Sequence, residues 1–113
     1  MHEPAETVRV ETTVDSREGA EEVAASVIGS RLAACAQVSG PITSFYRWEG
    51  ETQSDEEWMV VIKTAADRLD DLVSHVVEVH PYDVPEVVAV PVAGGNPGYL
   101  DWVRDETRGS GSA

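Results

Sequence analysis

The sequence predicts an α+β fold in which two helices cover one face of a four-stranded antiparallel sheet. Three observations predict this class. Segments with alternating apolar residues, which are typical of strands, are interleaved with two segments in which apolar residues recur at helical spacing. The elements follow one another in the order β-α-β-β-α-β-α. The connections between them are short, which favours adjacent elements and right-handed crossovers.

Residues 7–14 form the first expected strand, because apolar or β-branched residues alternate there with more polar ones. A helix over residues 16–34 follows, since apolar residues recur on one face as far as Leu32. We expect Asp15 to cap this helix, with Glu18 three residues later as its partner in a capping box.

A long hairpin over residues 42–64 is the expected centre of the sheet. Its polar turn contains Gly50, which we expect at positive φ. The incoming arm alternates between two faces, whereas residues 58–62 of the outgoing arm are apolar on both faces. The incoming strand begins at Cys35, and Gly40-Pro41 predicts a bulge or bend within it.

The second helix carries a regular apolar stripe. We expect Thr64 or Asp67 to cap it, and Pro81 to stop it. Residues 87–92 form a short apolar strand, and Pro91 within it favours a position at an edge or end of the sheet.

A last short helix is expected after Asn96, which can serve as N-cap with Pro97 at the first helical position. Residues 7–108 then make up one domain of ordinary size. Residues 1–6 and 109–113 are expected to be flexible ends. The first six elements correspond to a ferredoxin-like βαββαβ sandwich, to which the short C-terminal helix is added.

The sheet contains more apolar surface than two helices can cover. When both helices lie on one face, the other face should be polar in a monomer. Residues 58–62 and 87–92 are apolar on both faces, and the resulting patch is larger than monomers usually expose. We therefore expect an obligate homo-oligomer in which other copies cover the open face.

The net charge of −13, from 21 acidic and 8 basic residues, narrows the classes of partner. It disfavours nucleic acids and anionic membranes, which bind basic surfaces, and is compatible with attracting cations. The single cysteine, Cys35, has no partner for an internal disulfide. We expect a cytoplasmic protein, since no run approaches the roughly 20 apolar residues of a membrane span and no leader-like segment opens the chain.

Six segments, in the same order, resemble the CutA family, which is named for divalent cation tolerance. They are ETTVD (11–15), RLAAC (31–35), ITSFYRWEGE (42–51), IKT (62–64), HPYDVPE (80–86) and NPGYLDW (96–102). The resemblance covers about residues 8–106. It implies a ferredoxin-like fold assembled as a tight homotrimer, similar to the PII signalling proteins, in which hairpin arms extend a neighbour's sheet.

Cys35 and His80 are the candidate metal ligands. A thiol suits Cu(I) or Zn(II), and the resemblance implies copper, because some members of the family are described as binding it through cysteine and histidine. The alternatives are a small buried residue at Cys35 and a helix-capping histidine at position 80. Thr12 and Val79 stand where such members often carry a further cysteine and a second histidine.

The loop over residues 81–86 is bracketed by prolines and is expected at a subunit interface, either as a docked turn or as the wall of a ligand-binding cleft. The residues expected to line this intersubunit cleft are Tyr46, Arg47, Lys63, His80, Tyr82 and Glu86. Aromatic residues are enriched at protein interfaces, and those expected in the trimer interface are Phe45, Tyr46, Trp48 and Trp58. The acidic residues of the hairpin tip are expected to be solvated or to collect a cation loosely.

These observations predict a homotrimeric divalent-cation-tolerance protein that binds metal ions weakly, with Cu(II) or another divalent cation as ligand and no required cofactor. The main alternative is a PII-like sensor or scaffold with a small ligand or a protein partner between its subunits. Lys63, Arg47 and Arg68 would serve an anionic or nucleotide ligand. A small ferredoxin-like isomerase or monooxygenase is a further hypothesis. We expect no enzyme, because neither a phosphate-binding loop nor an acid–base pair is evident.

Overall fold

The computed structural model describes residues 6–108 and confirms the expected order of elements. Of the ends expected to be flexible, residues 1–5 and 109–113 lie outside the described residues, and only Glu6 is described. The elements are β1 (Thr7–Val14), α1 (Arg17–Gly29), β2 (Cys35–Trp48), β3 (Glu51–Ala65), the 3₁₀ helix η1 (Ala66–Arg68), α2 (Leu69–Val79), β4 (Val88–Pro91) and α3 (Pro97–Glu106).

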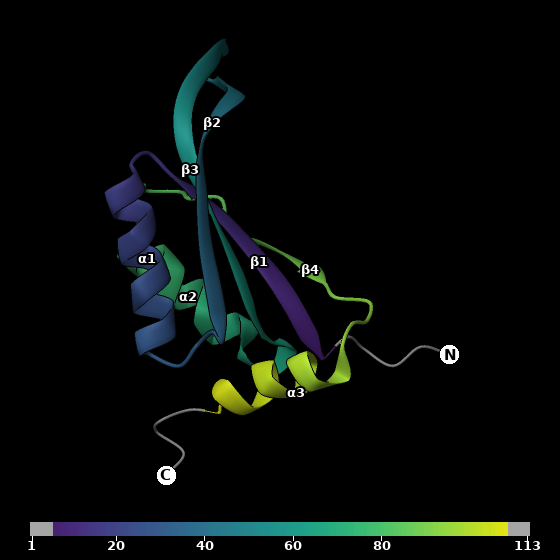
Figure 1. Cartoon of the computed structure of the whole chain (residues 1–113). Coiled ribbons are helices and arrows are strands. Elements are labelled where there is room, and N and C mark those ends of the chain that lie inside the picture. The colour runs from purple at the N-terminus through teal and green to yellow at the C-terminus, as the bar shows by residue number, and fades with distance from the viewer. Residues whose placement is uncertain (1–5, 109–113) are drawn as a thin grey trace.

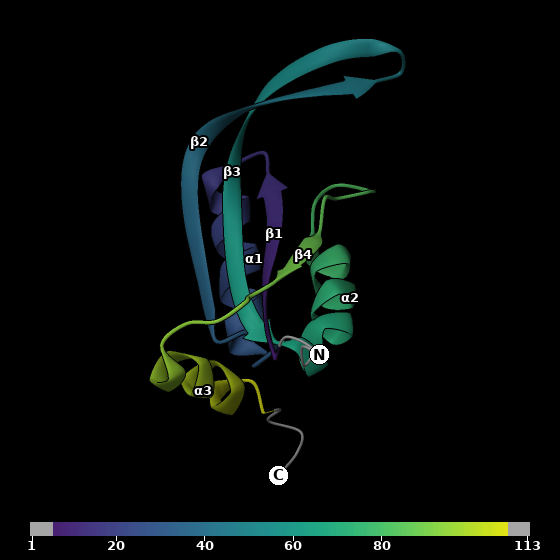
Figure 2. The same ribbon diagram turned by 90° about the vertical axis from the view of Figure 1, so that its right-hand side faces the viewer.

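The four strands form one antiparallel sheet in the order β2-β3-β1-β4, which is the ferredoxin-like topology. Helices α1 and α2 lie on one side of the sheet, and α3 lies at the end opposite the hairpin turn (Figure 1). The hairpin of β2 and β3 extends beyond the other strands and curves over the loop that joins α2 to β4 (Figure 2).

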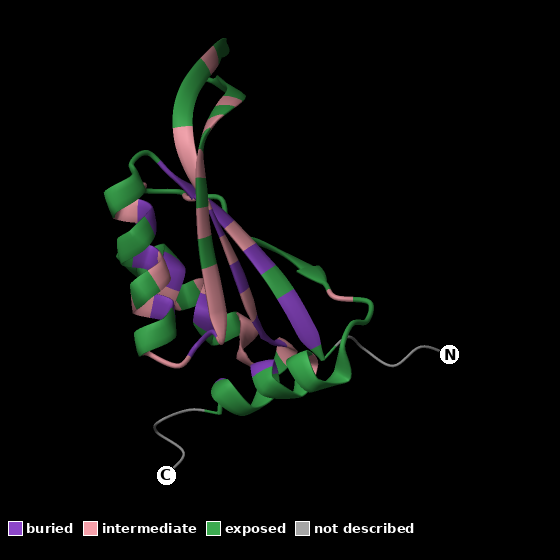
Figure 3. Ribbon diagram, in the orientation of Figure 1, coloured by how far each residue is buried: buried purple, intermediate pink, exposed green. Residues whose placement is uncertain are grey.

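The hydrophobic core lies between the sheet and the two helices. Alternate residues of β1 and of the C-terminal part of β3 point toward α1 and α2, and these positions are buried (Figure 3). They are residues 8, 10, 12 and 14 of β1 and residues 60, 62 and 64 of β3. The fully buried apolar side chains of this core are Val10, Val14, Val60 and Ile62 from the sheet and Ala20, Val23, Val27, Leu72 and Val76 from the helices. Trp58 packs against this core from its own chain.

The opposite face of the sheet has no helical layer and carries a mixture of apolar and charged side chains. Val88 and Val90 of β4 are 49% and 48% exposed, and Val61 of β3, which is separated from Val88 by Glu11 of β1, is half-buried. Arg9 and Glu11 of β1 form an ion pair of 2.9 Å on the same face. Of residues 58–62, Trp58, Val60 and Ile62 therefore face the core, and only Met59 and Val61 lie on the open face.

The hairpin closes through a two-residue turn. Glu49 and Gly50 both have positive φ, at 51° and 81°, which is typical of a type I′ turn that matches the twist of the strands. Gly50 confirms the expectation for that residue, whereas Glu49 was not foreseen in this conformation.

The expected irregularity in β2 is also present. Ser39 pairs with Met59 and Ile42 pairs with Glu57, so three steps along β2 correspond to two along β3. One extra residue is thus accommodated at Gly40-Pro41, where the peptide bond is cis. Such a bulge moves the side chains that follow it to the other face of the strand.

The start and end of α1 differ from the sequence-based expectation. Ser16, and not Asp15, caps the helix, with its side chain accepting a 2.9 Å hydrogen bond from the Gly19 amide. The helix ends at Gly29 and does not reach residue 34. It stops because Arg31 adopts a left-handed conformation, with φ of 61°, and the Leu32 amide bonds back to the Val27 carbonyl.

The cap expected for α2 is absent as well. The Thr64 hydroxyl donates to the Leu32 carbonyl at 2.7 Å and so ties β3 to the segment after α1. Asp67 forms a bidentate pair with Arg108. The short 3₁₀ helix leads directly into α2 without a side-chain cap. Two expectations for the C-terminal part of the chain are confirmed. Pro91 ends β4, which is an edge strand, and the side chain of Asn96 caps the N-terminus of α3.

Replacement of Gly40 by alanine should destabilise the protein by about 2 kcal/mol. Its φ is 146°, and a Cβ atom would lie 2.8 Å from Cδ1 of Trp58 and 3.1 Å from the Glu57 carbonyl oxygen. Chemical denaturation monitored by circular dichroism measures this change.

Gly29→Ala is the matched control, because nothing lies within 4 Å of a Cβ atom there. It should leave the free energy of unfolding unchanged or raise it by up to about 1 kcal/mol. Equal effects of the two substitutions on the free energy of unfolding would contradict the steric conflict expected for a side chain at position 40.

Candidate functional site

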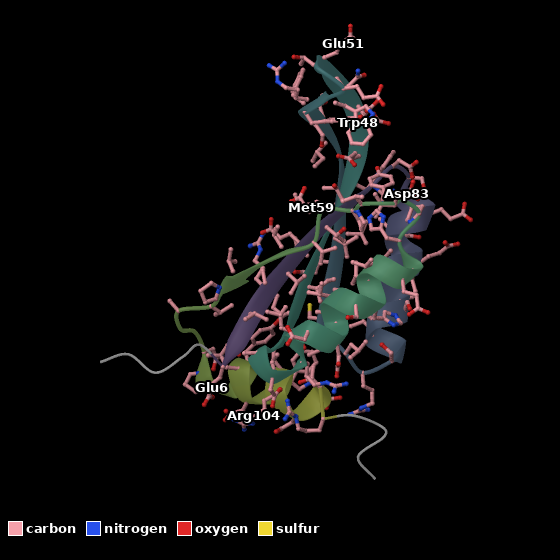
Figure 4. All side chains as sticks on the ribbon, turned by 180° about the vertical axis from the view of Figure 1, so that it is seen from behind. Glu6, Trp48, Glu51, Met59, Asp83 and Arg104 are labelled. Atoms are coloured by element: carbon pink, nitrogen blue, oxygen red, sulfur yellow. The ribbon has the colours of Figure 1, made fainter. Side chains whose placement is uncertain are left out.

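The hairpin and the loop after α2 border a half-open pocket of about 480 Å³. It is lined by Thr13, Tyr46, Trp48, Tyr82, Asp83, Val84 and Glu86. Thr13 comes from the end of β1, two aromatic residues come from β2, and the rest come from the loop. Trp48 on the hairpin and Asp83 on the loop are labelled in Figure 4.

His80 fixes the start of this loop. Its side chain is 7% exposed, and both ring nitrogens are hydrogen-bonded. Nδ1 accepts a 3.1 Å bond from the Tyr82 amide, and Nε2 lies 2.9 Å from the Thr13 carbonyl oxygen. Because an amide only donates and a carbonyl only accepts, the ring is neutral with its proton on Nε2. His80 therefore joins the end of α2 to β1 and positions Tyr82.

Tyr82 connects the loop to the hairpin. Its ring packs on His80 with a centroid distance of 4.6 Å, and its hydroxyl donates a 2.7 Å bond to a carboxylate oxygen of Glu57. Burial of the ring, followed by this hydrogen bond to Glu57, raises the pKa of Tyr82 well above its usual value. The ring is thus held in one orientation at the pocket wall.

Tyr46 makes a similar contact within the hairpin. Its hydroxyl donates to the carboxylate of Asp55, and this bond raises the pKa of Tyr46. The strand register places Tyr46 and Trp48 on the same face of the hairpin as Asp55 and Glu57. Two tyrosine–carboxylate pairs therefore stand on the side of the hairpin that faces the pocket.

The carboxylates of the pocket carry no compensating positive charge within residues 6–108. Asp83 and Glu86 take part in none of the ion pairs formed there. The side chains that line the pocket are aromatic, acidic, hydroxyl-bearing or aliphatic, and none is basic. The pocket is therefore suited to a ligand that is positively charged or neutral.

The structure brings together three of the six residues expected in the cleft. Tyr46, Tyr82 and Glu86 line the pocket, and His80 contacts Tyr82 behind it. The other two residues lie elsewhere: Arg47 bonds the Gly50 carbonyl at the hairpin turn, and Lys63 bonds Gln37 on the open face of the sheet.

Four further residues line the pocket that were not named for the cleft, namely Thr13, Trp48, Asp83 and Val84. For Trp48 a signal exists in the sequence, because it lies two residues after Tyr46 in an extended strand and so shares its face. Asp83 and Val84 belong to the loop over residues 81–86, which was expected as a possible wall of the cleft. For Thr13 the sequence contains no comparable signal, since its proximity depends on how the loop packs against the end of β1.

The two candidate metal ligands lie at different ends of the sheet. Cys35 is half-buried and pairs with Lys63 in the register of β2 and β3. The pKa of Tyr99 on α3 is raised, chiefly by burial and to a lesser extent by Cys35. His80 is bonded to Thr13 at the other end of β1. A site that joins Cys35 and His80 within one chain is thus not formed.

Within residues 6–108, no three histidine, cysteine, aspartate or glutamate side chains are grouped in a way that could hold a metal ion. A helix-capping role was the alternative to metal binding expected for His80 from the sequence. In the structure, His80 is the C-cap residue of α2. Metal binding by Cys35 or His80 stays a prediction.

The family model of the CutA1 divalent ion tolerance protein matches residues 8–106. The chain belongs to the CutA1 family. A divalent-cation tolerance protein CutA of Thermus thermophilus is 44% identical over 95 residues, which cover 84% of this chain and 92% of that protein. A chloroplastic CutA protein of Arabidopsis thaliana is 43% identical over 111 residues, which cover 96% of this chain. The resemblance seen in the sequence is thereby confirmed.

Solved CutA1 structures share the fold. The CutA1 structure from Oryza sativa has a TM-score of 0.89 and 43% identity, covering 93% of this chain and 96% of that one. The Thermus thermophilus structure has a TM-score of 0.86 and 42% identity, covering 88% and 97%. The chain spans only 61% and 59% of the length of the Arabidopsis and rice CutA proteins it matches. In residues 6–108, no helix has the length and apolar character needed to cross a membrane.

The free energy of unfolding should fall as the pH rises above about 10, the ordinary pKa of a tyrosine. Tyr82 keeps its proton in the folded state, whereas the unfolded chain releases it near pH 10, so alkaline conditions favour unfolding. The fall should be smaller in Tyr82→Phe. Denaturant titrations at pH 8 and at several values above 10 measure the difference.

Tyr46→Phe is the comparison, because Tyr46 is exposed and the effect of its removal on the alkaline slope should be smaller. An unchanged alkaline slope in Tyr82→Phe would contradict the raised pKa of Tyr82.

Proposed function

We propose that this CutA1-family protein acts as a homotrimer that contributes to divalent cation tolerance by binding metal ions weakly. The observation that carries the proposal is the family match over residues 8–106. Two further features support it. Exposed aromatic residues on the hairpin favour contact with another copy of the chain, and the strongly acidic composition favours the attraction of cations. The expected cytoplasmic location stays a prediction, and the names of relatives include both chloroplastic and periplasmic.

The hairpin arm supports assembly. Phe45 is 73% exposed and Trp48 is 60% exposed, and they lie on opposite faces of the arm. Large aromatic side chains on both faces of a projecting arm are typical of a surface that another chain covers. Of the four residues expected in the trimer interface, Phe45, Tyr46 and Trp48 are available for such a contact, whereas Trp58 packs against its own core.

The properties of this chain favour weak rather than tight metal binding. The net charge of −13 draws cations toward the surface. No ready-made group of three ligands exists within residues 6–108. A tighter site would therefore need ligands from more than one copy, and copper binding at His80 would replace at least one of the hydrogen bonds made by its ring.

A second candidate function is that of a PII-like sensor or scaffold, which binds a small ligand or a protein partner in the cleft. It is favoured by the pocket of about 480 Å³ where the hairpin meets the loop. This volume lies in the range of pockets that hold small molecules, which is roughly 300–1,000 Å³. Oligomeric ligand sensing and metal tolerance are compatible uses of one assembly.

Light scattering at micromolar concentration should give a mass three times that of the 12.2 kDa chain. Trp48→Glu should shift the population toward smaller species, because it places a charge in the apolar contact. Glu78→Gln, at an exposed position of α2 away from the hairpin, is the control and should keep the trimer. A particle of 12.2 kDa for the wild-type chain would contradict the proposed assembly.

Calorimetric titration with Cu(II) and Zn(II) should show binding in the submillimolar range, and His80→Ala should abolish the copper signal. Cys35→Ser tests the second candidate ligand in the same way. His75→Ala is the matched control, because His75 is bonded to Ser26 between the two helices, away from the pocket. Nucleotide binding without any metal binding would contradict the metal proposal in favour of the sensor.

A further inference from the structure

We propose that the side of the sheet not covered by helices joins the copies of the homotrimer head to tail, with a basic and aliphatic end of one copy against an acidic and aromatic end of the next. The inference rests on the proposed homotrimer and names the chemistry of its contact. It also assigns an occupant to the pocket between the hairpin and the loop, which is the basic end of a neighbouring copy.

A ring of three copies limits the surfaces that can join it. In a twofold dimer the same patch occurs on both sides of the contact, whereas a closed ring of three joins two different patches at every contact. The chain must therefore carry two surfaces of complementary chemistry. Helices α1 and α2 cover one side of the sheet, which leaves the other side for this contact (Figure 1).

The first surface, the basic end, lies where β1, β3 and β4 are paired. Arg9 stands between Lys63 of β3 and Val90 of β4 in the strand register, and Val88 stands opposite Glu11 in the next row. Arg9 is paired with Glu11 at 2.9 Å. Lys63 takes part in none of the ion pairs formed within residues 6–108. The two half-exposed valines thus flank a surface that carries one positive charge without a carboxylate partner.

The second surface, the acidic end, is the same side of the hairpin beyond the bulge, together with the loop after α2. Tyr46 and Trp48 of β2 supply its aromatic rings. Its carboxylates are Glu51, Asp55 and Glu57 of β3 and Asp83 and Glu86 of the loop. A positively charged and aliphatic surface from another copy is complementary to both its charge and its rings.

The two ends cannot neutralise each other within one chain. Lys63 and Glu57 are six positions apart on β3, which corresponds to roughly 20 Å along a strand. An ion pair requires a distance of about 4 Å or less. The hairpin tip, with Glu51, projects still farther from Lys63, at the opposite end of the molecule from α3 (Figure 2). A head-to-tail arrangement brings these charges together between copies.

The net charge of the chain makes such a local contact necessary. Copies that each carry a charge of −13 repel one another as a whole. A lysine that is covered by an apolar surface also loses its hydration, and this loss is offset only when a carboxylate lies beside it. Lys63 is already half-buried in the single chain. The surface that covers it in the assembly must therefore be acidic, which the acidic end of the next copy is.

Cross-linking with a water-soluble carbodiimide tests the contact directly. The reagent joins an amine to a carboxylate that touches it, forming an amide while the carbodiimide becomes a urea. Lys63 is the only lysine of the chain, so peptide mapping of the product is unambiguous. Denaturing gels should show cross-linked dimers and trimers, in which Lys63 is joined to a carboxylate within residues 51–57 or 83–86. Lys63→Arg keeps the charge without the reactive amine, so it should lose these bands and stay trimeric in light scattering.

Charge reversal is the second test, measured as the concentration at which the trimer dissociates. Lys63→Glu should raise this concentration at least about tenfold, because it places a carboxylate against the acidic end. Glu51→Lys together with Asp55→Lys should do the same from the other side. All three substitutions in one chain should recover most of the association, since the two ends again carry opposite charges at every contact.

The matched controls change the net charge by the same amount on the helical side of the sheet. Arg17→Glu on α1 is compared with Lys63→Glu, and Glu22→Lys with Glu78→Lys is compared with the double substitution on the hairpin. All three control positions are exposed, and these variants should dissociate at nearly the wild-type concentration. Circular dichroism measures whether each variant keeps its fold.

Cross-links from Lys63 that lead only to carboxylates of α1 or α2 would overturn the inference, as would the absence of cross-linked bands in a trimeric sample. A trimer that is unaffected by Lys63→Glu would also overturn it, and so would a loss that the combined substitutions do not reverse. In each of these cases the trimer itself remains. A wild-type particle of 12.2 kDa would instead contradict the homotrimer on which the inference rests.

Discussion

The extra residue at Gly40-Pro41 in β2 determines which side chains of the hairpin face the pocket. Before the bulge, Ala36 and Val38 point toward the helices; after it, Tyr46 and Trp48 point to the opposite side of the sheet. A regular strand would place Phe45 and Arg47 there instead. The aromatic wall of the pocket and its lack of a basic residue both depend on this single register shift.

His80 and Tyr82 provide the other half of the same arrangement. A neutral histidine bonded to Thr13 and to the Tyr82 amide holds the loop against β1, and Tyr82 reaches across to Glu57 on the hairpin. These hydrogen bonds give His80 a structural role in holding the loop, which does not require a metal ion. Both ring nitrogens of His80 already form hydrogen bonds, so a metal ion at this ring would have to displace at least one of them.

Much of the fold was accessible from the sequence because it depends on local patterns. The alternation in residues 7–14, the proline at the end of β4 and the Asn96 cap each reflect a rule that acts over a few residues. The end of α1 was missed because Arg31 takes a left-handed conformation that is unusual for a residue with a side chain. The cap of α2 was missed because Thr64 and Asp67 bond to distant partners.

The candidate site was predictable only in part, for a related reason. The sequence indicated that the base of the hairpin meets the loop, and it grouped Tyr46, Tyr82 and Glu86, which line one pocket in the single chain. It also grouped Arg47 and Lys63 with them, because both are basic and near the hairpin in sequence. In the single chain, Arg47 lies on the other face of the hairpin because of the bulge, and that register is not specified by any single segment. Lys63 shares the face of Thr13 but lies four residues further along β3 than Met59, the partner of Thr13.

The two edges of the sheet are very unequal. β4 offers only four residues and ends in a proline, whereas β2 offers fourteen residues along its outer side. Main-chain amides and carbonyls on such an edge bond to another strand regardless of which side chains they carry. A contact made along β2 would therefore persist while the exposed side chains around it change, so surface sequence could diverge between relatives without loss of a shared mode of association.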